Sequence, residues 1–476
     1  MPPLLALSLA TLFIIYLFWR DWRQRPRVSS AIWIPCVWML ILGSRGVSEW
    51  LNLGAPFESA DDLLEGTPTN RLVFLGLIAA SWIVLWRRHI PWRALFRTNV
   101  WLSVFFLYCG LSILWSEFPF VALKRWTKGL GDPMMALILL SEREPAKAVE
   151  TVIKRCAYVL IPLSIIFIKY YPELGRSYDV WTGRAFYTGV TTNKNLLGHL
   201  LMVFGLFFVC ALFGKRTRDR EAGKRMDAAI AVVFLLMVEW LFWTADSKTA
   251  LMGFIVGSLV VLGLRSANVR RHWGMYAVAG ILVCVTLQLS FDMAERLIAS
   301  AGRDATLTGR TELWASVLRM RVDAWIGAGF ESFWLGERLK RLWAEYDFRP
   351  TQAHNGYIEI YLNLGWVGLC LLGGVLWAGY RTIQKRLNVS TDPGRTKTGD
   401  IAFATFGLAY LTAYALYNVT EGTFKALDIL FIIFLITAIE YPSTQAAGNS
   451  TGRNWIDARP FSPAPSLDKL HRRPVS

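Results

Sequence analysis

The stretch from Thr308-Gly309-Arg310 to His354-Asn355-Gly356-Tyr357 lies in a long polar interval of a chain that is otherwise dominated by apolar segments. Apolar runs close to the ~20 residues that cross a bilayer as a helix recur on both sides of this interval. They predict membrane spans over 4–19, 28–44, 71–87, 99–115, 121–140, 152–170, 195–213, 228–244, 249–264, 273–290, 358–380, 401–417 and 426–440.

These runs predict an all-α polytopic membrane protein with about 12–13 transmembrane helices. One large helical loop, 291–357, interrupts them outside the membrane. The sequence thus divides into N-terminal helices over 1–290, the loop 291–357, C-terminal helices over 358–440 and a polar tail over 441–476. The tail is rich in Ser, Pro, Gly and Arg without apolar periodicity, so we expect it to be disordered and cytoplasmic.

The composition agrees with a helix bundle in lipid. The 476 residues are 54% hydrophobic and 18% charged, whereas a soluble protein carries about 25% charged residues. The net charge of +16 could suggest nucleic acid, but the basic residues gather in short loops between apolar segments, and we expect no nucleic-acid partner. None of the six cysteines has C-x-x-C spacing, so neither a disulfide framework nor a zinc site is predicted.

The basic loops fix the orientation of the spans. They follow spans one, three, seven, nine and eleven, at 20–25, 87–97, 215–225, 265–271 and 381–395. Because cytoplasmic loops carry the excess of Lys and Arg, all five are placed in the cytoplasm. The N-terminus and the interval 291–357 then face outside. The span 121–140 begins with three basic residues, but without it the later loops would break this charge rule.

Two residues of the outer interval suit acid–base and anion chemistry. His354 lies directly before a span at the outer membrane boundary, where it could be a general base or could hold the end of the loop by hydrogen bonds. Imidazole with its ordinary pKa of about 6.5 suits proton abstraction at neutral pH. Arg310 could be a surface arginine at a helix start, or a planar charged fork for a phosphate or pyrophosphate.

The rest of the interval predicts two short helices and two more candidate contacts. Apolar residues at helical spacing follow Arg310 as far as the glycines at 327 and 329, and a second amphipathic pattern covers 335–346. Arg349 and Asn355 flank His354 and are candidate substrate-binding residues.

Further positive charge lies in other outer segments. Arg184, Lys194 and Asn195 precede or begin span seven, and Lys248 lies in the tight turn before span nine. These groups could reach lipid phosphates by snorkelling, or could complete an anion site with Arg310. Charge at the start of span five points the same way, because ionisable residues in membrane segments are functional by default. The residues concerned there are Lys124, Arg125 and Lys128.

Motifs that the chain lacks narrow the chemistry. The sequence has no D-x-D or metal-ligand cluster, no G-x-x-x-x-G-K-[ST] and no G-x-S-x-G. No cofactor or metal is therefore expected. A reaction on an outer anion without metal or ATP needs a pre-activated donor, and a lipid-linked diphosphate sugar fits, with arginines stabilising the leaving pyrophosphate.

Several short motifs resemble those of the bacterial O-antigen ligase and O-antigen polymerase family. They are Thr308-Gly309-Arg310, Gly327 with Gly329, and His354-Asn355 followed by Gly365 and Gly368. Three others are similar to exopolysaccharide-polymerase-like members: Ser247-Lys248-Thr249, Asn193-Lys194-Asn195 with Gly198, and Leu114-Trp115-Ser116 with Pro119. Their order covers roughly the segment 180–380, while the N-terminal spans match more loosely.

The resemblance implies an inner-membrane glycosyltransferase with a large periplasmic loop. It would move a glycan from an undecaprenyl-diphosphate carrier to a sugar hydroxyl, with inversion and without metal. His354 would be the base, and Arg310 with Arg184 would grip the diphosphate. Where many members have Ser-Arg, this chain has Ser247-Lys248, which keeps the charge but loses bidentate recognition. The implied partners are the lipid-linked donor, a glycan or lipid A-core acceptor, the bilayer and other polysaccharide assembly proteins.

Three alternatives stay open at this point. A ligase and a polymerase share the donor chemistry and differ in the acceptor, so the sequence does not separate them. A transporter or flippase for lipid-linked saccharides would need ionisable residues near mid-membrane or two related halves, whereas charge here gathers at outer ends, with Glu239 as the main exception. A scaffold subunit of an export complex would not need His354.

Overall fold

The computed structural model describes residues 1–24, 27–53, 67–178, 183, 185–213, 222–276, 310–346, 348–389 and 398–442. The predicted span 273–290 and the start of the predicted loop lie mostly outside these residues, as do Thr308, Gly309, Arg184 and almost all of the tail.

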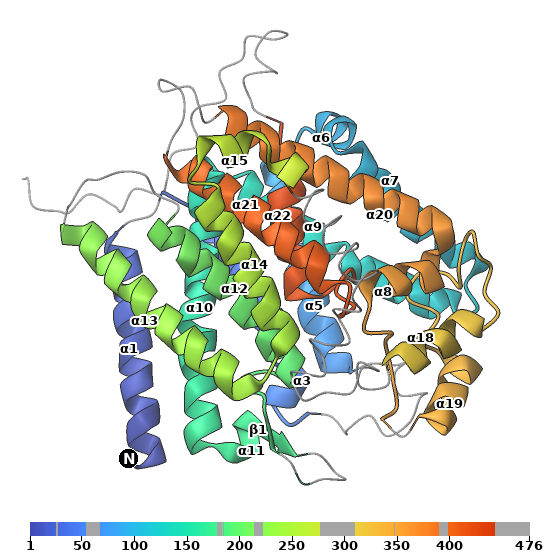
Figure 1. Ribbon diagram of the computed structural model, residues 1–476, viewed down its shortest axis with the longest axis horizontal. Coiled ribbons are helices and arrows are strands. Elements are labelled where there is room, and N and C mark those ends of the chain that lie inside the picture. The colour runs from blue at the N-terminus through green and yellow to red at the C-terminus, as the bar shows by residue number, and fades with distance from the viewer. Residues whose placement is uncertain are drawn as a thin grey trace, which may run out of the picture. The chain divides into compact units, whose positions relative to one another are not determined.

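The described chain is built almost entirely of helices (Figure 1). The only strands among the described residues are β1 (Arg176–Tyr178) and β2 (Ala185–Tyr187), which pair antiparallel. The helices are α1 (Pro3–Arg23), η1 (Ser30–Ile32), α2 (Trp33–Leu42), α3 (Val47–Trp50), α5 (Pro68–Arg87), α6 (Trp92–Thr98), α7 (Val100–Leu111), η2 (Ser112–Trp115), α8 (Pro119–Gly129), α9 (Gly131–Leu140), α10 (Pro145–Tyr170), α11 (Pro172–Gly175), α12 (Lys194–Phe213), α13 (Ala222–Ala245), α14 (Lys248–Gly263), α15 (Ala267–Arg271), α18 (Arg310–Arg319), α19 (Gly336–Glu345), α20 (Gly356–Val389), α21 (Thr398–Tyr417) and α22 (Ile429–Ala438).

Six of the described helices are long and apolar enough to cross a membrane, namely α1, α5, α10, α12, α13 and α20. A seventh span results if α6 and the helix Val100–Trp115, bent by 98° at their junction, are counted as one. Three shorter apolar helices accompany them, at Ser30–Leu42, Lys248–Gly263 and Ile429–Ala438. The predicted all-α polytopic membrane fold is confirmed, although several predicted spans are short or bent helices.

The helix α12 is the best-covered candidate span, since 78% of its apolar window is buried against other helices. It packs on α13, α14 and α21 (Figure 1). Gly198 permits the close approach to α14, because a Cβ there would lie 2.6 Å from Ser247 Oγ. Small residues let helices approach closely in lipid, and this contact sets the start of α14 beside that of α12.

The predicted span 121–140 is two helices. α8 mixes exposed apolar side chains with Lys124, Arg125 and Lys128, while α9 is apolar and almost fully buried. α8 begins at Pro119 after the η2 turn, and Ser116 Oγ forms a 2.7 Å hydrogen bond with Ser332 Oγ of the large loop. Arg125 Nη1 of α8 also donates to Glu331 O at 2.6 Å, so the basic half of the predicted span is joined to the loop.

The large loop has a hydrophobic core of its own. Leu313 and Val317 of α18 and Leu339 and Leu342 of α19 are buried together with Leu362 of α20. α19 matches the predicted second helix, whereas α18 ends at Arg319, before the glycines at 327 and 329.

α20 is broken at Gly365, whose backbone has φ +65° and ψ −164°. The loop segment 324–329 fills the break. Trp366 N donates to Ala324 O at 2.9 Å, and Gly329 N donates to Asn363 O at 2.8 Å. A Cβ on Gly365 would lie 2.2 Å from the Trp325 carbonyl carbon, so glycine is required by both the positive φ and the contact. Backbone groups freed by the break are satisfied by the loop, as buried polar groups require.

Candidate active site

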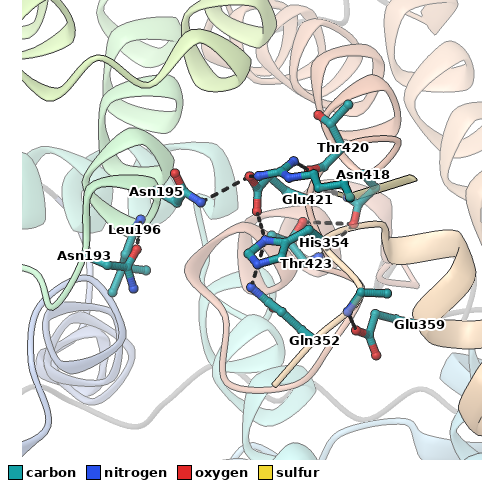
Figure 2. Close-up of polar contacts among 12 residues, drawn as sticks. Asn193, Asn195, Leu196, Gln352, His354, Glu359, Asn418, Thr420, Glu421 and Thr423 are labelled. Carbon is teal, nitrogen blue, oxygen red and sulfur yellow. Dashed lines mark hydrogen bonds and ion pairs between the residues drawn. The ribbon is translucent and has the colours of Figure 1, made fainter. Parts of the chain in front are cut away.

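His354 and a buried carboxylate form the centre of the site (Figure 2). His354 Nδ1 lies 3.0 Å from Glu421 Oε2, and the two side chains are 26% and 4% exposed. With the Nδ1 proton donated to the carboxylate, the lone pair of the ring is on Nε2. The histidine is thus oriented by an acid that water hardly reaches, while part of the ring stays accessible.

Arg310 and Asn195 bind the other oxygen of the same carboxylate. Arg310 Nη2 donates to Glu421 Oε1 at 2.8 Å, and Asn195 Nδ2 donates to it at 3.2 Å. Arg310 Nη1 also donates to the carbonyl oxygen of Thr420. A guanidinium has five N–H groups, so N–H groups beyond the two used in these bonds can donate to another acceptor.

The charges around Glu421 keep it ionised. Burial by itself would raise the pKa of Glu421, but the hydrogen bonds and positive charges of His354 and Arg310 outweigh burial and hold that pKa below its usual value. An ionised carboxylate is the form that accepts a proton-bearing Nδ1 and stabilises an imidazolium. The cluster therefore has the electrostatics of an oriented general base.

The sequence around His354 fixes the histidine to the turn that carries Glu421. Asn355 caps α20 by accepting from Tyr357 N and Ile358 N, both at 3.0 Å, and its Nδ2 donates to Val419 O at 2.8 Å. Gly356 N donates to Glu421 O at 3.0 Å. His354 itself has φ +52°, a strained conformation of the kind that gathers at functional sites.

Asn418 stabilises the turn that carries Glu421 through hydrogen bonds made inside the turn. It is fully buried, and its Oδ1 accepts from Thr423 N at 2.9 Å and from Thr423 Oγ1 at 3.0 Å. A Cβ on Gly356 would lie 2.2 Å from this Oδ1. The glycine after His354-Asn355 thus allows the helix start to touch the turn.

The start of α12 supplies Asn195. Asn193 Oδ1 accepts from Leu196 N at 2.9 Å, which satisfies an otherwise unpaired N–H of the first helical turn. The cap places Asn195 on the side of α12 that meets Glu421 (Figure 2). Lys248 begins α14, and its neighbour Ser247 lies against Gly198 of α12.

Only some of the predicted site residues lie together around Glu421. The structure brings His354, Arg310 and Asn195 together on one carboxylate, while Asn355 holds the backbone beside them. Lys194 lies with Nζ 4.9 Å from the Phe186 ring centroid, and Arg349 stacks on Trp343 at 5.5 Å in the loop. Arg184 lies outside the described residues.

Sequence reasoning missed Glu421, on which the other side chains converge. A signal was present in the topology. Glu421 is the single carboxylate between the predicted spans 401–417 and 426–440, and the positive-inside pattern places that short loop on the same outer side as His354. An acidic residue facing a basic surface is the natural partner for its charges.

Comparisons with known proteins agree with the predicted membrane fold and family resemblance. Residues 232–373 match the family described as O-antigen ligase, Wzy_C. The chain is also 24% identical to the exopolysaccharide production protein ExoQ of Rhizobium meliloti (strain 1021) over 305 residues, which cover 63% of this chain and 68% of that protein. Arg310 and His354 lie inside the family match, whereas Asn195 and Glu421 lie outside it.

These findings support a polytopic membrane enzyme of polysaccharide assembly that transfers glycosyl groups. The resemblance to the O-antigen ligase and exopolysaccharide polymerase family, predicted from the motifs, is confirmed by both comparisons.

Proposed function

We propose that the protein moves a glycan from an undecaprenyl-diphosphate carrier to a sugar hydroxyl at the periplasmic face of the bacterial inner membrane. The observation that carries the proposal is the hydrogen-bonded group of His354, Glu421 and Arg310. It combines a base, a carboxylate that orients the base and a cation in a membrane protein similar to an exopolysaccharide production protein.

The reaction is a single displacement at the anomeric carbon. The acceptor hydroxyl oxygen attacks this carbon while its proton passes to Nε2 of His354. The bond between the anomeric carbon and the diphosphate oxygen breaks, and its electron pair leaves with the diphosphate. Glu421 stabilises the imidazolium that forms, as the carboxylate does in other oriented histidine bases. One displacement inverts the anomeric configuration.

The leaving diphosphate needs positive charge. Arg310 offers a planar fork that suits phosphate oxygens. Lys248 and Lys194 begin the two neighbouring helices α14 and α12, and Asn195 ties the start of α12 to Glu421. Fixed cations aimed at developing charge stabilise a transition state, so we expect transfer without a metal ion.

The acceptor decides between ligase and polymerase. The similarity to a protein named for exopolysaccharide production favours the joining of repeat units over attachment to lipid A-core.

The proposal is tested by glycan transfer from a lipid-linked diphosphate donor, with purified full-length protein in EDTA. Wild type should transfer, and His354→Ala and Arg310→Ala should lose transfer by about 10²–10⁴-fold, the usual contribution of a general base or a charge-stabilising group. Unchanged transfer by folded His354→Ala would show that His354 is not the general base. Movement of lipid-linked glycan across vesicles without any product would indicate a transporter.

A further inference from the structure

A cavity of about 320 Å³ adjoins the His354 cluster. Its lining includes Arg125, Glu331, Trp334, Gln352, Glu359 and Lys425. The proposed mechanism uses none of these side chains.

The cavity lies next to the base and its carboxylate, because two of its lining residues adjoin them. Gln352 Nε2 lies 3.3 Å from His354 Nδ1, and Gly422 follows Glu421 in the chain. In Figure 2, Gln352 and Glu359 lie below and to the right of His354, while Asn195 lies to its left. The cavity therefore adjoins His354 on a different side from Asn195.

The side of His354 that carries Asn195 and the side that adjoins the cavity are built from different helices. The start of α12 and α14 supplies Asn195 and the two lysines assigned to the donor. The cavity is walled by residues of α7, α8, α20 and α22, which lie on the other side of α14 from α13 in Figure 1. In a displacement with inversion the nucleophile enters opposite the leaving group, so a second substrate has to approach His354 from the side away from the diphosphate.

The wall of the cavity suits a sugar ring. It contains several aromatic side chains, of which Trp334 is fixed by a 2.8 Å hydrogen bond from Nε1 to Glu359 Oε2. Aromatic faces pack against the apolar C–H face of a pyranose, and a few placed polar groups set the orientation of a ligand in such a pocket. Gln352 is a polar group of this kind, whereas Asn363 is held by the backbone of Ser332, Phe333 and Glu359.

The rim carries positive charge. Lys425 is exposed, and its Nζ donates to Gln352 Oε1 at 3.1 Å. Arg125 Nη1 donates to Glu331 O at 2.6 Å. Glu331, Arg125, Arg71 and Lys124 all lie close enough to Lys128 to act on its charge, so three cations and one carboxylate surround it. Of the two acidic side chains in the lining, Glu359 is committed to Trp334 and to the backbone N–H of Ala353.

We infer that this cavity is the acceptor site, and that it takes the terminal sugar of an anionic glycan with a phosphate, diphosphate or carboxylate group at the rim. The sugar lies on the aromatic wall with a hydroxyl toward His354, and the negative group meets Arg125 and Lys425. This inference rests on the proposed function, since it assigns the second substrate of the same site.

The test separates acceptor from donor kinetics. Thr351→Trp places bulk at an exposed position of the lining, and Lys425→Met removes a rim charge. Ala344→Trp adds the same bulk on the exposed face of α19, outside the lining, and serves as the control. The acceptor probes are the undecaprenyl-diphosphate-linked glycan, the same glycan released as its 1-phosphate, and the neutral glycan.

Both lining variants should raise the acceptor KM by about tenfold or more, the size expected when one charged contact or its site is lost. The donor KM and the kcat at saturating acceptor should stay close to wild type. Lys425→Met should lose its effect with the neutral glycan. An effect for the lipid-linked form but not for the 1-phosphate would place the lipid diphosphate at the rim, and equal effects would mean that phosphate alone is recognised.

An unchanged acceptor KM in both folded variants would overturn the acceptor site while leaving the transfer function intact. If wild type gives no transfer, the proposed function fails, and the cavity is judged by saturation-transfer NMR with the released glycan 1-phosphate. Signals present in wild type and Ala344→Trp but absent in Thr351→Trp would support a glycan site, and equal signals in all three would refute it.

Discussion

Replacing Glu421 by Gln should disable the site while keeping its shape. The side chain is 4% exposed and accepts from Arg310 at 2.8 Å, from His354 at 3.0 Å and from Asn195 at 3.2 Å. Glutamine fills the same volume but carries no charge, and its amide nitrogen cannot accept the Nδ1 proton. All three bonds therefore lose their ionised acceptor, and the bonds from Arg310 and His354 change most because these donors carry or acquire positive charge.

The structure gives the size of the effect. A hydrogen bond to a charged group contributes about 1.5–3 kcal/mol and a neutral one about 0.5–1.5 kcal/mol. Two such changes, at Arg310 and His354, lower the free energy of unfolding by about 2–3 kcal/mol. Because the histidine loses its fixed tautomer, kcat should fall by about 10²–10⁴-fold. Glu421→Asp keeps the charge on a shorter side chain and should fall between wild type and Glu421→Gln.

The assay is transfer from a lipid-linked diphosphate donor under saturating conditions, together with thermal unfolding of the same detergent-solubilised samples. Glu337→Gln is the matched control, since that side chain is 91% exposed and pairs only with Lys340 among the ion pairs of the described residues. A folded Glu421→Gln protein with wild-type kcat would refute the idea that the carboxylate orients His354.

Four further outcomes follow from the same contacts. Gly365→Ala should lower the free energy of unfolding by at least about 2 kcal/mol, because φ is +65° and the new Cβ would meet backbone at 2.2 Å. Gly373→Ala in the same helix meets nothing within 4 Å and should raise it by about 0.5–1 kcal/mol, so equal melting shifts would contradict this account. At φ +52°, His354→Gly should be more stable than His354→Ala by about 1 kcal/mol in unfolding experiments, with both inactive. Arg310→Lys should raise the donor KM by about tenfold, since one ammonium cannot reproduce the fork, and an unchanged KM would argue against diphosphate binding there. The lowered pKa of Glu421 means that its stabilisation is present above the ordinary value of 4.5 and is lost as the pH falls through the folded-state pKa. Melting curves of wild type and Glu421→Gln should therefore converge in acid, and a constant gap would count against the ion pairs.

Much of the fold and part of the site could be predicted from apolar run length and loop charge. These two signals are local and additive, and they place His354, Arg310 and Asn195 on one outer surface. The helix α20 shows the limit. Its apolar pattern continues past Gly365, so the predicted span 358–380 reads as one helix, and only the insertion of segment 324–329 breaks it.

Glu421 was not predicted because its partners are distant in the sequence. The bond from Asn195 to Glu421 joins residues 226 positions apart, and Arg310 lies 111 positions before Glu421. No periodic pattern links such distant positions. Arg349 illustrates the converse, since an arginine close to His354 in sequence stacks on Trp343 instead.

The long sequence separation of the cluster has a consequence for synthesis in the cell. His354 leaves the ribosome 67 residues before Glu421, which at 5–20 residues per second is a delay of roughly 3–13 s. Until the hairpin of α21 and α22 enters the bilayer, the imidazole has no carboxylate to fix its tautomer, and Arg310 has no Glu421 or Thr420 to bind. In a nascent chain, His354 and Arg310 therefore gain their shared carboxylate only after the turn between α21 and α22 has been synthesised.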